Sequence, residues 1–518
     1  MINPNSDRDF INQYVNLSPE EKVRHYPQYF EGIRFDCFRT LRNTTLEFRY
    51  PVTVITGNNC SGKTSVLMSI ACSHYHFMRR NPVNGHLDRN TWGQIMQFTR
   101  KDIQAEDWVY YVTYREGNRH VSDKRGARRR ATKKWSGVAK KESQIGSSPQ
   151  GRVVTLIDME RTVPLRCISK TLYLWAKGRE AERAIDARVA EYLGYVYEKD
   201  YHVSEVLEKG GNVVYSYRTN NQYSSYNTAT GEDVLTRVLR DICEAPDYSL
   251  VLIDEIESGL HPKIQRRLMD VINYESRNKH KQFIITTHSA TIFSCVEPNA
   301  RIFLNKVGIE TNAVSPVSIS EALSRMDSIS HPLMKVYVED EISKRMVEKA
   351  ISDICNVKPG FNYVVKCVII GSADRTYSYF KTTQQIYEGG QLFDDTGFAC
   401  VLDGDMKNAT DRTGRLKYPQ EELLFFHFSD KAPERMLLEQ YLILNPDEQL
   451  RFYMSQNPHC VLGKLVELGI CANNNEAFEI CWSCLLQNPD GMAYFGSLKD
   501  FLIQGTQHFH LRALKFLR

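Results

Sequence analysis

The sequence has no long hydrophobic run. No apolar stretch among its 518 residues approaches the roughly 18 residues that a membrane-spanning helix needs. The opening segment Met1–Phe10 is too polar for a signal peptide. Internal repeats and low-complexity tracts are also missing from the sequence. These absences predict a cytoplasmic protein with no membrane partner, and the length favours two to four domains that each bury a core.

The cysteines give no metal-binding framework. The chain has 13 of them without a repeating spacing. Cys481-x-x-Cys484 has neither a second pair nor histidines at zinc-finger distance, so we expect these two thiols to lie in a core. Charged residues make up 25% and hydrophobic ones 42%, which is typical of a globular chain.

The most specific motif is a glycine-rich loop between a predicted strand and a predicted helix. The apolar run Val52–Thr56 predicts the strand, Ser65–Cys72 predicts the helix, and the loop between them fits G-x-x-x-x-G-K-[ST]. A chance match in a flexible loop is disfavoured by this frame. Backbone N–H groups in such a loop surround phosphates, Lys63 would reach the β- and γ-phosphates, and the Thr64 hydroxyl would bind Mg²⁺. The residues expected to bind ATP here are Gly57, Asn58, Asn59, Cys60, Ser61, Gly62, Lys63, Thr64 and Ser65. A cysteine inside this loop indicates a reducing compartment.

Two later apolar runs complete a nucleotide site. Ser249–Ile253 is continuous, as expected of a parallel strand buried on both faces, and it ends at Asp254 and Glu255. Asp254 would hold Mg²⁺, and Glu255 would polarise the water that attacks the γ-phosphate. Phe283–Thr287 repeats the pattern and ends at His288, placed to contact the γ-phosphate. Each feature alone can be structural, but together and in this order they predict a magnesium-dependent ATPase.

The segment 252–262, followed by Thr286–Ser289, resembles the ABC-like ATPases of the overcoming-lysogenization-defect (OLD) and SMC-related group. Ile33–Arg39 is similar to their N-terminal strand. ABC-type ATPases carry a Ser-Gly-Gly-Gln signature where this chain has Thr228–Glu232, and only the Gly-Glu core matches. The resemblance implies that Gly231 and Glu232 complete the ATP site of a partner subunit, in a head-to-head homodimer or a higher oligomer.

Positive charge is concentrated between residues 115 and 141. Eleven Lys or Arg residues stand there against two acids, with too few apolar residues for a helix face, so we expect a mobile loop. The segment is either a solvated insertion without a task or a contact with the phosphate backbone of DNA. The candidate DNA-binding residues are Arg128, Arg129, Arg130, Lys133 and Lys134.

The ATPase half has room for an insertion. Lys63 and Asp254 are 191 positions apart, more than a bare P-loop core needs. Leu165–Val206 is expected to be largely helical, and Ala181–Ala190 is rich in helix formers. We therefore expect an inserted helical or dimerisation element at about residues 165–210.

The C-terminal part shows a βαβαβ rhythm. After His331-Pro332, the runs Lys335–Val338, Val364–Ile370 and Phe398–Leu402 alternate with helical stretches, which predicts a parallel sheet with crossover helices. The fold class is α/β, with an ABC-type P-loop ATPase domain at residues 1–330 and a second α/β domain at 331–518.

Acidic residues follow the first and third of these strands. Glu339 comes after the first, and Asp403 and Asp405 after the third. Carboxyl ends of parallel strands meet at one sheet edge, where such carboxylates can hold Mg²⁺ or Mn²⁺ for phosphodiester cleavage. The alternative is that acidic strand ends are ordinary loop starts.

The TOPRIM fold is similar in the order of its acids and in their positions after parallel strands, which correspond here to Glu339, Asp403 and Asp405. A TOPRIM domain behind an OLD-type ATPase is the architecture of OLD nucleases, and the resemblance covers roughly residues 29–430. This chain departs from many TOPRIM domains in having Asp340 and Ser343 where those carry Gly and Asp.

Further site residues are implied by the same resemblance. Glu341 would substitute as an extra metal ligand. Pro433–Glu439 is similar to a helix that brings another carboxylate, and of Glu434 and Glu439 we choose Glu439. Gly496–Asp500 resembles the segment with the active-site lysine, so Lys499 would stabilise charge on the scissile phosphate, unless it is an ordinary surface residue.

Two hypotheses follow. The resemblance implies an ATP-regulated, metal-dependent DNA endonuclease of anti-phage defence, with DNA and either a retron reverse transcriptase with its msDNA or a partner nuclease as partners. The alternative is an ATPase sensor or scaffold of a Septu-like defence complex, in which the TOPRIM-like half is inactive and the partner cleaves. SMC-like DNA repair is disfavoured because the insertion is too short for a long coiled coil.

Overall fold

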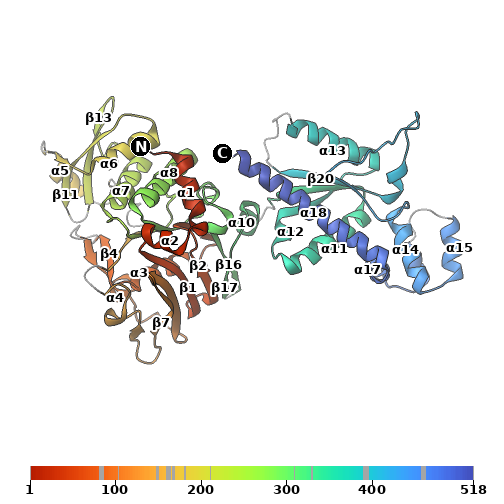
Figure 1. The fold of residues 1–518 in the computed structure, drawn as a ribbon, viewed down its shortest axis with the longest axis horizontal. Helices are drawn as coiled ribbons and strands as arrows, with labels where there is room; N and C mark the ends of the chain where they lie inside the picture. Colours follow the sequence, from red (N-terminus) through yellow and green to blue (C-terminus); the bar gives the residue numbers. More distant parts are fainter. Residues whose placement is uncertain are drawn as a thin grey trace. The chain divides into compact units, whose positions relative to one another are not determined.

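The computed structural model divides the chain into two compact units, Met1–Met326 and Asp327–Arg518 (Figure 1). The expected domain boundary fell between residues 330 and 331. The residues that the structure describes are 2–80, 87–102, 104–147, 151–158, 165, 170–179, 182–209, 212–308, 310–327, 331–388, 396–456 and 462–516. Within these ranges, every helix is too short or too polar to span a membrane.

The first unit is built on one large sheet. Its described strands are β1 (Gln28–Phe38), β2 (Leu41–Glu47), β3 (Val52–Gly57), β4 (His76–Arg80), β5 (Leu87–Arg89), β6 (Trp108–Glu116), β7 (Arg119–Arg128), β8 (Trp135–Gly137), β9 (Val153–Ile157), β14 (Leu250–Ile253), β15 (Gln282–Thr286), β16 (Arg301–Val307) and β17 (Glu310–Val314). They are ordered β5-β4-β9-β14-β15-β3-β16-β17-β2-β1-β6-β7-β8. From β4 to β16 all neighbours are parallel, and from β2 to β8 all are antiparallel. One sheet thus joins a parallel core to an antiparallel lobe.

The lobe and the core meet where β17 lies beside β2. Only one residue pair, Thr311 with Leu41, is in register between these strands. A side-chain bond supplements it, because the Thr44 hydroxyl donates to the Thr311 carbonyl oxygen.

Helices cover both faces of the parallel core. They include α3 (Lys63–Cys72), α6 (Ala187–Tyr197), α7 (Thr230–Glu244), α8 (Pro262–Lys279), α9 (Ala290–Ser294) and α10 (Ile319–Met326), with α1 (Pro4–Gln13) and α2 (Pro19–His25) at the N-terminus. Alternate residues of β14 enter two separate cores: Leu250 and Leu252 pack with α3, whereas Val251 and Ile253 pack with α7 and α8. Burial on both faces explains the continuous apolar runs. The predictions of strands β3, β14 and β15 and of helix α3 are confirmed.

The expectation of a mobile loop at 115–141 is wrong. Strands β6 and β7 form a hairpin through the two-residue turn Gly117-Asn118, and β8 continues the sheet. Arg128 is only 5% exposed, and its guanidinium lies 3.9 Å from the centre of the Phe98 ring and donates to Gln104. Arg128 is therefore part of a core and is unsuited to contact DNA. The other four candidates, Arg129, Arg130, Lys133 and Lys134, are exposed in the β7–β8 turn.

The expectation of a largely helical insertion at 165–210 is half wrong. The segment contains α5 (Lys170–Ala176) and α6, but also β10 (Arg183–Ala184) and β11 (His202–Lys209). With β12 (Asn212–Arg218) and β13 (Gln222–Ser224), these strands form a separate four-stranded sheet. Residues 166–169, 180–181 and 210 of the segment lie outside the described residues.

The second unit contains the predicted parallel sheet. Strands β18 (Met334–Val338), β19 (Val365–Ile369), β20 (Gly397–Leu402) and β21 (Leu424–Phe426) are ordered β19-β18-β20-β21, and all neighbours are parallel. Helix α11 (Glu341–Val357) links β18 to β19, and α13 (Ala373–Glu388) links β19 back past β18 to β20. Right-handed crossovers in opposite directions place these two helices on opposite faces.

A group of helices completes this unit. They are α12 (Phe361–Val364), α14 (Pro433–Leu444), α15 (Glu448–Gln456), α16 (Leu462–Glu467), α17 (Asn474–Gln487) and α18 (Pro489–Phe516). Cys481 and Cys484 are buried on α17 among apolar side chains, which confirms their prediction as core thiols.

A buried ion pair in the first unit offers a test of the fold. Lys281 and Glu275 are both fully buried and bonded to each other, and Lys281 also donates to the Ile242 carbonyl oxygen at 2.8 Å. We predict that Lys281→Met lowers the free energy of unfolding by about 3 kcal/mol, because Glu275 loses its fully buried cation and keeps the partly exposed Arg188 at 3.3 Å and the Tyr192 hydroxyl. Lys279→Met is the matched control: its 3.5 Å pair with Asp247 is exposed and should contribute at most about 1 kcal/mol. Equal urea denaturation midpoints for the two variants would contradict the prediction.

Candidate functional site

The glycine-rich loop closes tightly between β3 and α3. Gly57 has φ +151 and a Cβ there would lie 2.4 Å from the Leu304 carbonyl oxygen, while Gly62 has φ +98 and packs against Leu41. Cys60 also has a positive φ, 60°. These backbone angles turn the loop into a concave nest of N–H groups above the first turn of α3, which is the geometry that binds phosphate.

Lys63 lies inside this nest. Its Nζ donates to the carbonyl oxygens of Gly57 at 3.0 Å and Asn58 at 3.1 Å. Burial lowers the pKa of Lys63, and the nearby carboxylates of Glu255, Asp254 and Glu257 oppose that shift. The Ser61 hydroxyl is buried and makes no hydrogen bond to any described residue. A nucleotide phosphate would satisfy it, so the loop fits ATP.

The two halves of the predicted magnesium site are in direct contact. Thr64 Oγ1 donates to Asp254 Oδ2 at 2.9 Å, although 190 positions separate the two residues. The Thr286 hydroxyl donates to Asp254 Oδ1 at 2.5 Å and accepts from the Glu255 N–H at 3.0 Å. A hydroxyl and a carboxylate are the hard oxygen ligands that suit Mg²⁺. The bridging role of Thr286 was missed in the sequence, where it is the last residue of an apolar strand.

Glu255 and His288 lie side by side at the ends of neighbouring strands. His288 Nε2 is 3.9 Å from Glu255 Oε1. Glu257 holds this region by accepting from the Thr287 hydroxyl at 2.6 Å and from the His288 backbone N–H at 2.5 Å. The structure therefore gathers the loop lysine, the magnesium candidates, the candidate base and the histidine at the carboxyl ends of β3, β14 and β15.

The two candidate signature residues lie in the first turn of α7. Glu232 is 7% exposed and accepts hydrogen bonds from the hydroxyls of Tyr201, Tyr223 and Thr228. Its carboxylate is thus committed to the protein interior, and the expectation that it binds nucleotide is wrong. A Cβ on Gly231 would lie 2.6 Å from the Gly259 carbonyl oxygen, so this glycine lets α7 approach the segment after Glu255.

The second unit brings the predicted carboxylates together. Its strand order places β19 and β20 on either side of β18. The chain therefore leaves β18 and β20 in opposite directions, and the crevice at the carboxyl ends of these two strands is the topological switch point. Ligands bind at this point in open α/β sheets. Glu339 follows β18 and Asp403 follows β20. Glu339 Oε1 accepts from the Asp403 backbone N–H at 2.8 Å, and Asp403 Oδ1 accepts from the Ser343 hydroxyl at 2.6 Å.

Burial raises the pKa of both carboxyl groups. It raises the pKa of Asp403 to about 8, with repulsion from Glu339 adding to the effect. It raises the pKa of Glu339 to about 7, although the Asp403 N–H acts in the opposite direction. Asp405 Oδ1 is buried without a hydrogen bond to any described residue. Desolvated, mutually repelling carboxylates are what a cation would stabilise.

As arranged, these carboxylates do not form a closed ligand set. Among the described residues, no group of three or more His, Cys, Asp or Glu side chains is placed to hold a metal ion. Asp340 instead caps α11 by accepting from the Ser343 N–H at 2.8 Å. Ser343, at the position where many TOPRIM domains have Asp, binds Asp403 from the same turn.

Three residues that the resemblance implied are not part of this group. Glu341 is exposed and pairs with Lys344 at 3.2 Å. Glu439 pairs with Lys431 at 2.7 Å. Lys499 pairs with Asp353 at 2.7 Å, and Asp353 lies about 20 Å along α11 from Asp340 at 1.5 Å per residue. The expectation for Lys499 is wrong, because Asp353 holds it far from the carboxylates; the metal-binding roles of Glu341 and Glu439 stay predictions.

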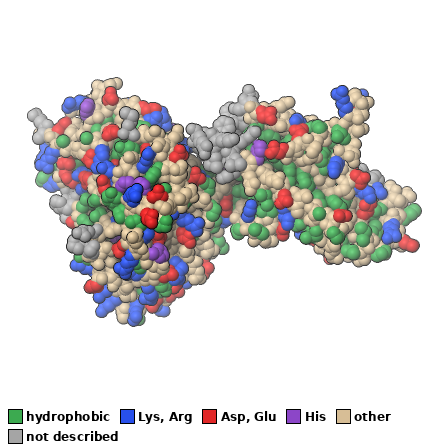
Figure 2. Space-filling model, viewed as in Figure 1, with side chains coloured by type: hydrophobic (Ala, Val, Ile, Leu, Met, Phe, Trp, Pro, Cys, Tyr) green, Lys and Arg blue, Asp and Glu red, His purple; other side chains and the backbone are tan. Residues whose placement is uncertain are grey.

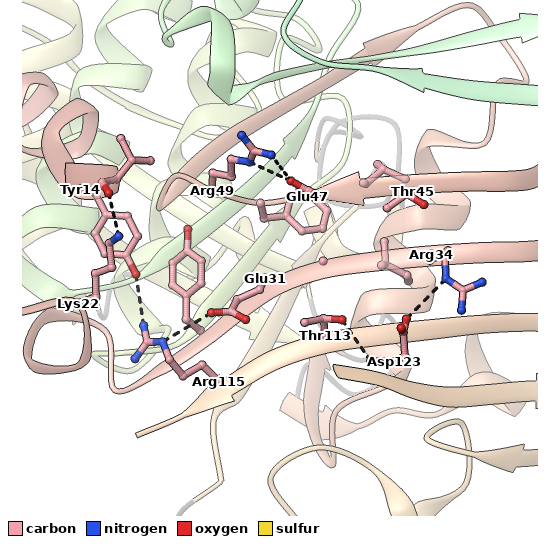
Figure 3. Close-up of a pocket in the computed structure, with 16 residues that line it drawn as sticks. Tyr14, Lys22, Glu31, Arg34, Thr45, Glu47, Arg49, Thr113, Arg115 and Asp123 are labelled. Atoms are coloured by element: carbon pink, nitrogen blue, oxygen red, sulfur yellow. Dashed lines mark hydrogen bonds and ion pairs between the residues drawn. The ribbon is translucent and has the colours of Figure 1, made fainter. Parts of the chain in front are cut away.

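A separate cavity of about 610 Å³ lies over the antiparallel lobe (Figure 3). It is lined by the far ends of β1 and β2, whereas the near end of β2, Leu41, contacts the phosphate loop. Its charged side chains are paired with one another or with the backbone: Arg115 with Glu31, Arg49 with Glu47, Arg34 with Asp123, and Lys22 with the Val15 carbonyl oxygen. We assign it no role in the chemistry.

Two family models match the first unit. One is described as "AAA domain" and matches residues 33–153, which include the phosphate loop. The other is described as "AAA domain, putative AbiEii toxin, Type IV TA system" and matches residues 236–294, which include Asp254, Glu255 and His288.

Individual proteins are similar to parts of the chain. "Retron Vc95 probable ATPase" of Vibrio cholerae serotype O1 biovar El Tor is 29% identical over 135 residues, which are 23% of this chain and 26% of the relative. The match thus spans about a quarter of the relative's length. The SMC head domain from Thermotoga maritima is 14% identical with a TM-score of 0.35, over 56% of this chain and all but 1% of that domain. The recombination mediator RecF is 14% identical with a TM-score of 0.32, over 56% of this chain and 100% of that one. From the site geometry and the AAA models, we conclude that the first unit is a P-loop ATPase domain.

The site geometry gives a test of the ATPase assignments. Lys63→Ala should abolish ATP binding, because the phosphates lose the cation inside the loop. Glu255→Gln should bind ATP like the wild type but hydrolyse it about 10²–10⁴-fold more slowly, since the amide cannot accept the proton of the attacking water. Glu191→Gln, an exposed position on α6, is the control and should change neither quantity. Wild-type turnover by Glu255→Gln in a phosphate-release assay would show that another residue is the base.

Proposed function

We propose that the protein is an OLD-type nuclease of anti-phage defence, in which the ATPase unit regulates metal-dependent DNA cleavage by a TOPRIM-like second unit. The observation that carries this proposal is the position of Glu339 and Asp403 at the switch point of a parallel four-stranded sheet. Ligand chemistry is expected there on topological grounds alone. The desolvation of both acids and the unbonded Asp405 oxygen support a cation as the ligand.

Glu339, Asp403 and Asp405 would hold Mg²⁺ or Mn²⁺. Such a metal ion supplies a nucleophilic water and neutralises charge on the phosphodiester. The chain itself orients the carboxylates through hydrogen bonds. The Ser343 hydroxyl donates to Asp403, and the Asp403 N–H donates to Glu339.

In the first unit, Lys63 would neutralise the phosphates of ATP and Glu255 would take the proton of the attacking water. A homodimer or higher oligomer through this unit follows from the ABC-like resemblance. The similarity to a retron ATPase supports a retron reverse transcriptase with its msDNA as the partner, with a partner nuclease as the alternative.

A second candidate function is an ATPase scaffold whose partner protein cleaves. The observation that favours it is the open arrangement of the carboxylates, together with Ser343 and the capping Asp340 at two positions where many TOPRIM domains differ. In this case the second unit would bind without cutting.

Plasmid cleavage separates the two candidates. Purified protein is incubated with supercoiled plasmid and Mg²⁺ or Mn²⁺, with and without ATP, and nicked and linear forms are measured. We predict cleavage by the wild type and a loss of about 10²-fold or more in Asp403→Asn, because the site loses a charged metal ligand. ATP turnover should stay near the wild-type rate, since Asp403 belongs to the other unit.

Glu348→Gln is the matched control, because it removes one exposed carboxylate from α11 of the same unit, and its cleavage rate should equal that of the wild type. Full defence activity of Asp403→Ala in cells, with no cleavage by the wild type under any divalent metal, would establish the scaffold instead.

The exposed cations of the β7–β8 turn are proposed to bind DNA. Replacing Arg129, Arg130, Lys133 and Lys134 by Ala should weaken binding to DNA of any sequence and lower the slope of log K against log salt by about one for each phosphate that the turn no longer neutralises. Fluorescence anisotropy across a salt series measures both. An unchanged slope would leave the turn as a solvated surface.

A further inference from the structure

A small hairpin follows the carboxylates of the second unit directly. After Asp403, the chain makes the short 3-10 helix η6 (Gly404–Asn408) and then reverses through residues 409–417, which we name the basic hairpin. Thr410 and Leu416 form an antiparallel bridge within it. The segment between β20 and β21 projects from the body of the unit (Figure 1).

The basic hairpin is an ordered structure. Asp411 N–H donates to the Arg415 carbonyl oxygen at 2.8 Å, and Lys417 N–H donates to the Ala409 carbonyl oxygen at 2.8 Å. The Asp411 carboxylate accepts from the backbone N–H groups of Thr413 at 2.7 Å and Arg415 at 3.0 Å, and from the Thr413 hydroxyl at 2.6 Å. The only acid of the hairpin is therefore used to build its turn.

The base of the hairpin is fixed beside the carboxylates. Lys417 Nζ lies 2.8 Å from Asp374 Oδ1, and the Tyr418 hydroxyl donates to the same oxygen at 2.7 Å. Asp374 is in the first turn of α13, and the neighbouring Ala373 N–H is directed at Glu339. At its other end, the hairpin follows Asp405 after only three residues, so both ends of the hairpin start from the switch-point crevice.

Positive charge dominates the outside of η6 and the basic hairpin. Lys407, Arg412 and Arg415 are exposed, and none of the three makes an ion pair with any residue that the structure describes. Lys and Arg side chains are visible on the projection at the upper right of the second unit (Figure 2). Elsewhere in the unit, cations such as Lys431, Lys499 and Lys381 are paired with acids.

This arrangement suits a polyanion. Arg side chains bind phosphate through two parallel N–H bonds, and a preformed turn presents them at little entropic cost. Because phosphate contacts carry no sequence information, the recognition would be independent of sequence.

We propose that the basic hairpin binds the phosphate backbone of a nucleic acid and guides it into the carboxylate crevice. The binding step stands on the hairpin's own geometry and charge, and only the cleavage that follows rests on the proposed nuclease function. Arg412 and Arg415 bind phosphate at the tip, and Lys407 binds it nearest the carboxylates.

The test compares two charge-matched variants of the full chain. Arg412→Ala/Arg415→Ala removes the two arginines of the hairpin and keeps Lys417, which anchors its base. Lys358→Ala/Lys366→Ala removes two exposed cations from the opposite, amino-terminal edge of the same sheet. A fluorescein-labelled duplex is titrated in Ca²⁺ across a salt series. We expect the hairpin variant to bind about tenfold or more weakly and to lower the salt slope by about 2, with the control variant unchanged. ATP turnover and the unfolding midpoint of both variants should match the wild type.

Each outcome separates the hairpin from the nuclease proposal. An unchanged affinity and slope in the hairpin variant, or an equal weakening in the control variant, overturns the role of the hairpin even if the wild type cleaves DNA. If the hairpin variant no longer binds DNA and the wild type cleaves none with any metal, the DNA-binding role of the hairpin is supported and the nuclease proposal is overturned. A wild type that binds no duplex in Ca²⁺ overturns the hairpin proposal as well.

Discussion

The parallel course of buried strands is the constraint on which both candidate sites depend. In the first unit, β3, β14 and β15 run in the same direction, so Lys63, Asp254 and His288 meet at one edge although they are far apart in sequence. In the second unit, β18 and β20 do the same for Glu339 and Asp403. The strands themselves need burial on both faces, and the charged residues can stand only where the strands end.

The acidic side chains have different partners at the carboxyl-end edges of the two sheets. In the ATPase unit, a lysine stands among the acids, and the hydroxyls of Thr64 and Thr286 bond both oxygens of Asp254. In the second unit, Glu339 and Asp403 face each other with donors of hydrogen bonds but no paired cation in the described residues. Burial and repulsion from neighbouring carboxylates therefore raise the pKa of both acids.

Sequence predicted the elements whose pattern is local. Continuous apolar runs identified β3, β14, β15, β18 and β20, and the glycine spacing placed the phosphate loop. The β6–β7 hairpin was missed because its many charges hid the two-residue Gly117-Asn118 turn, which is a hairpin signal in its own right. Lys499 was misplaced because the partner of a surface helix depends on long-range packing, which no spacing in the sequence encodes. The basic hairpin is short and polar, so its sequence pattern resembles that of a plain loop, and its local bonds and its anchor at Asp374 are seen only in the structure.

The junction between β17 and β2 connects the phosphate loop to the antiparallel lobe. A single residue pair is in register there, so the lobe is held to the parallel core mainly by side-chain packing in the hydrophobic core that both share. Leu41 belongs to this junction and also packs against Gly62 of the phosphate loop. A substitution that changes the size of Leu41 would therefore disturb the sheet junction and the loop at the same time.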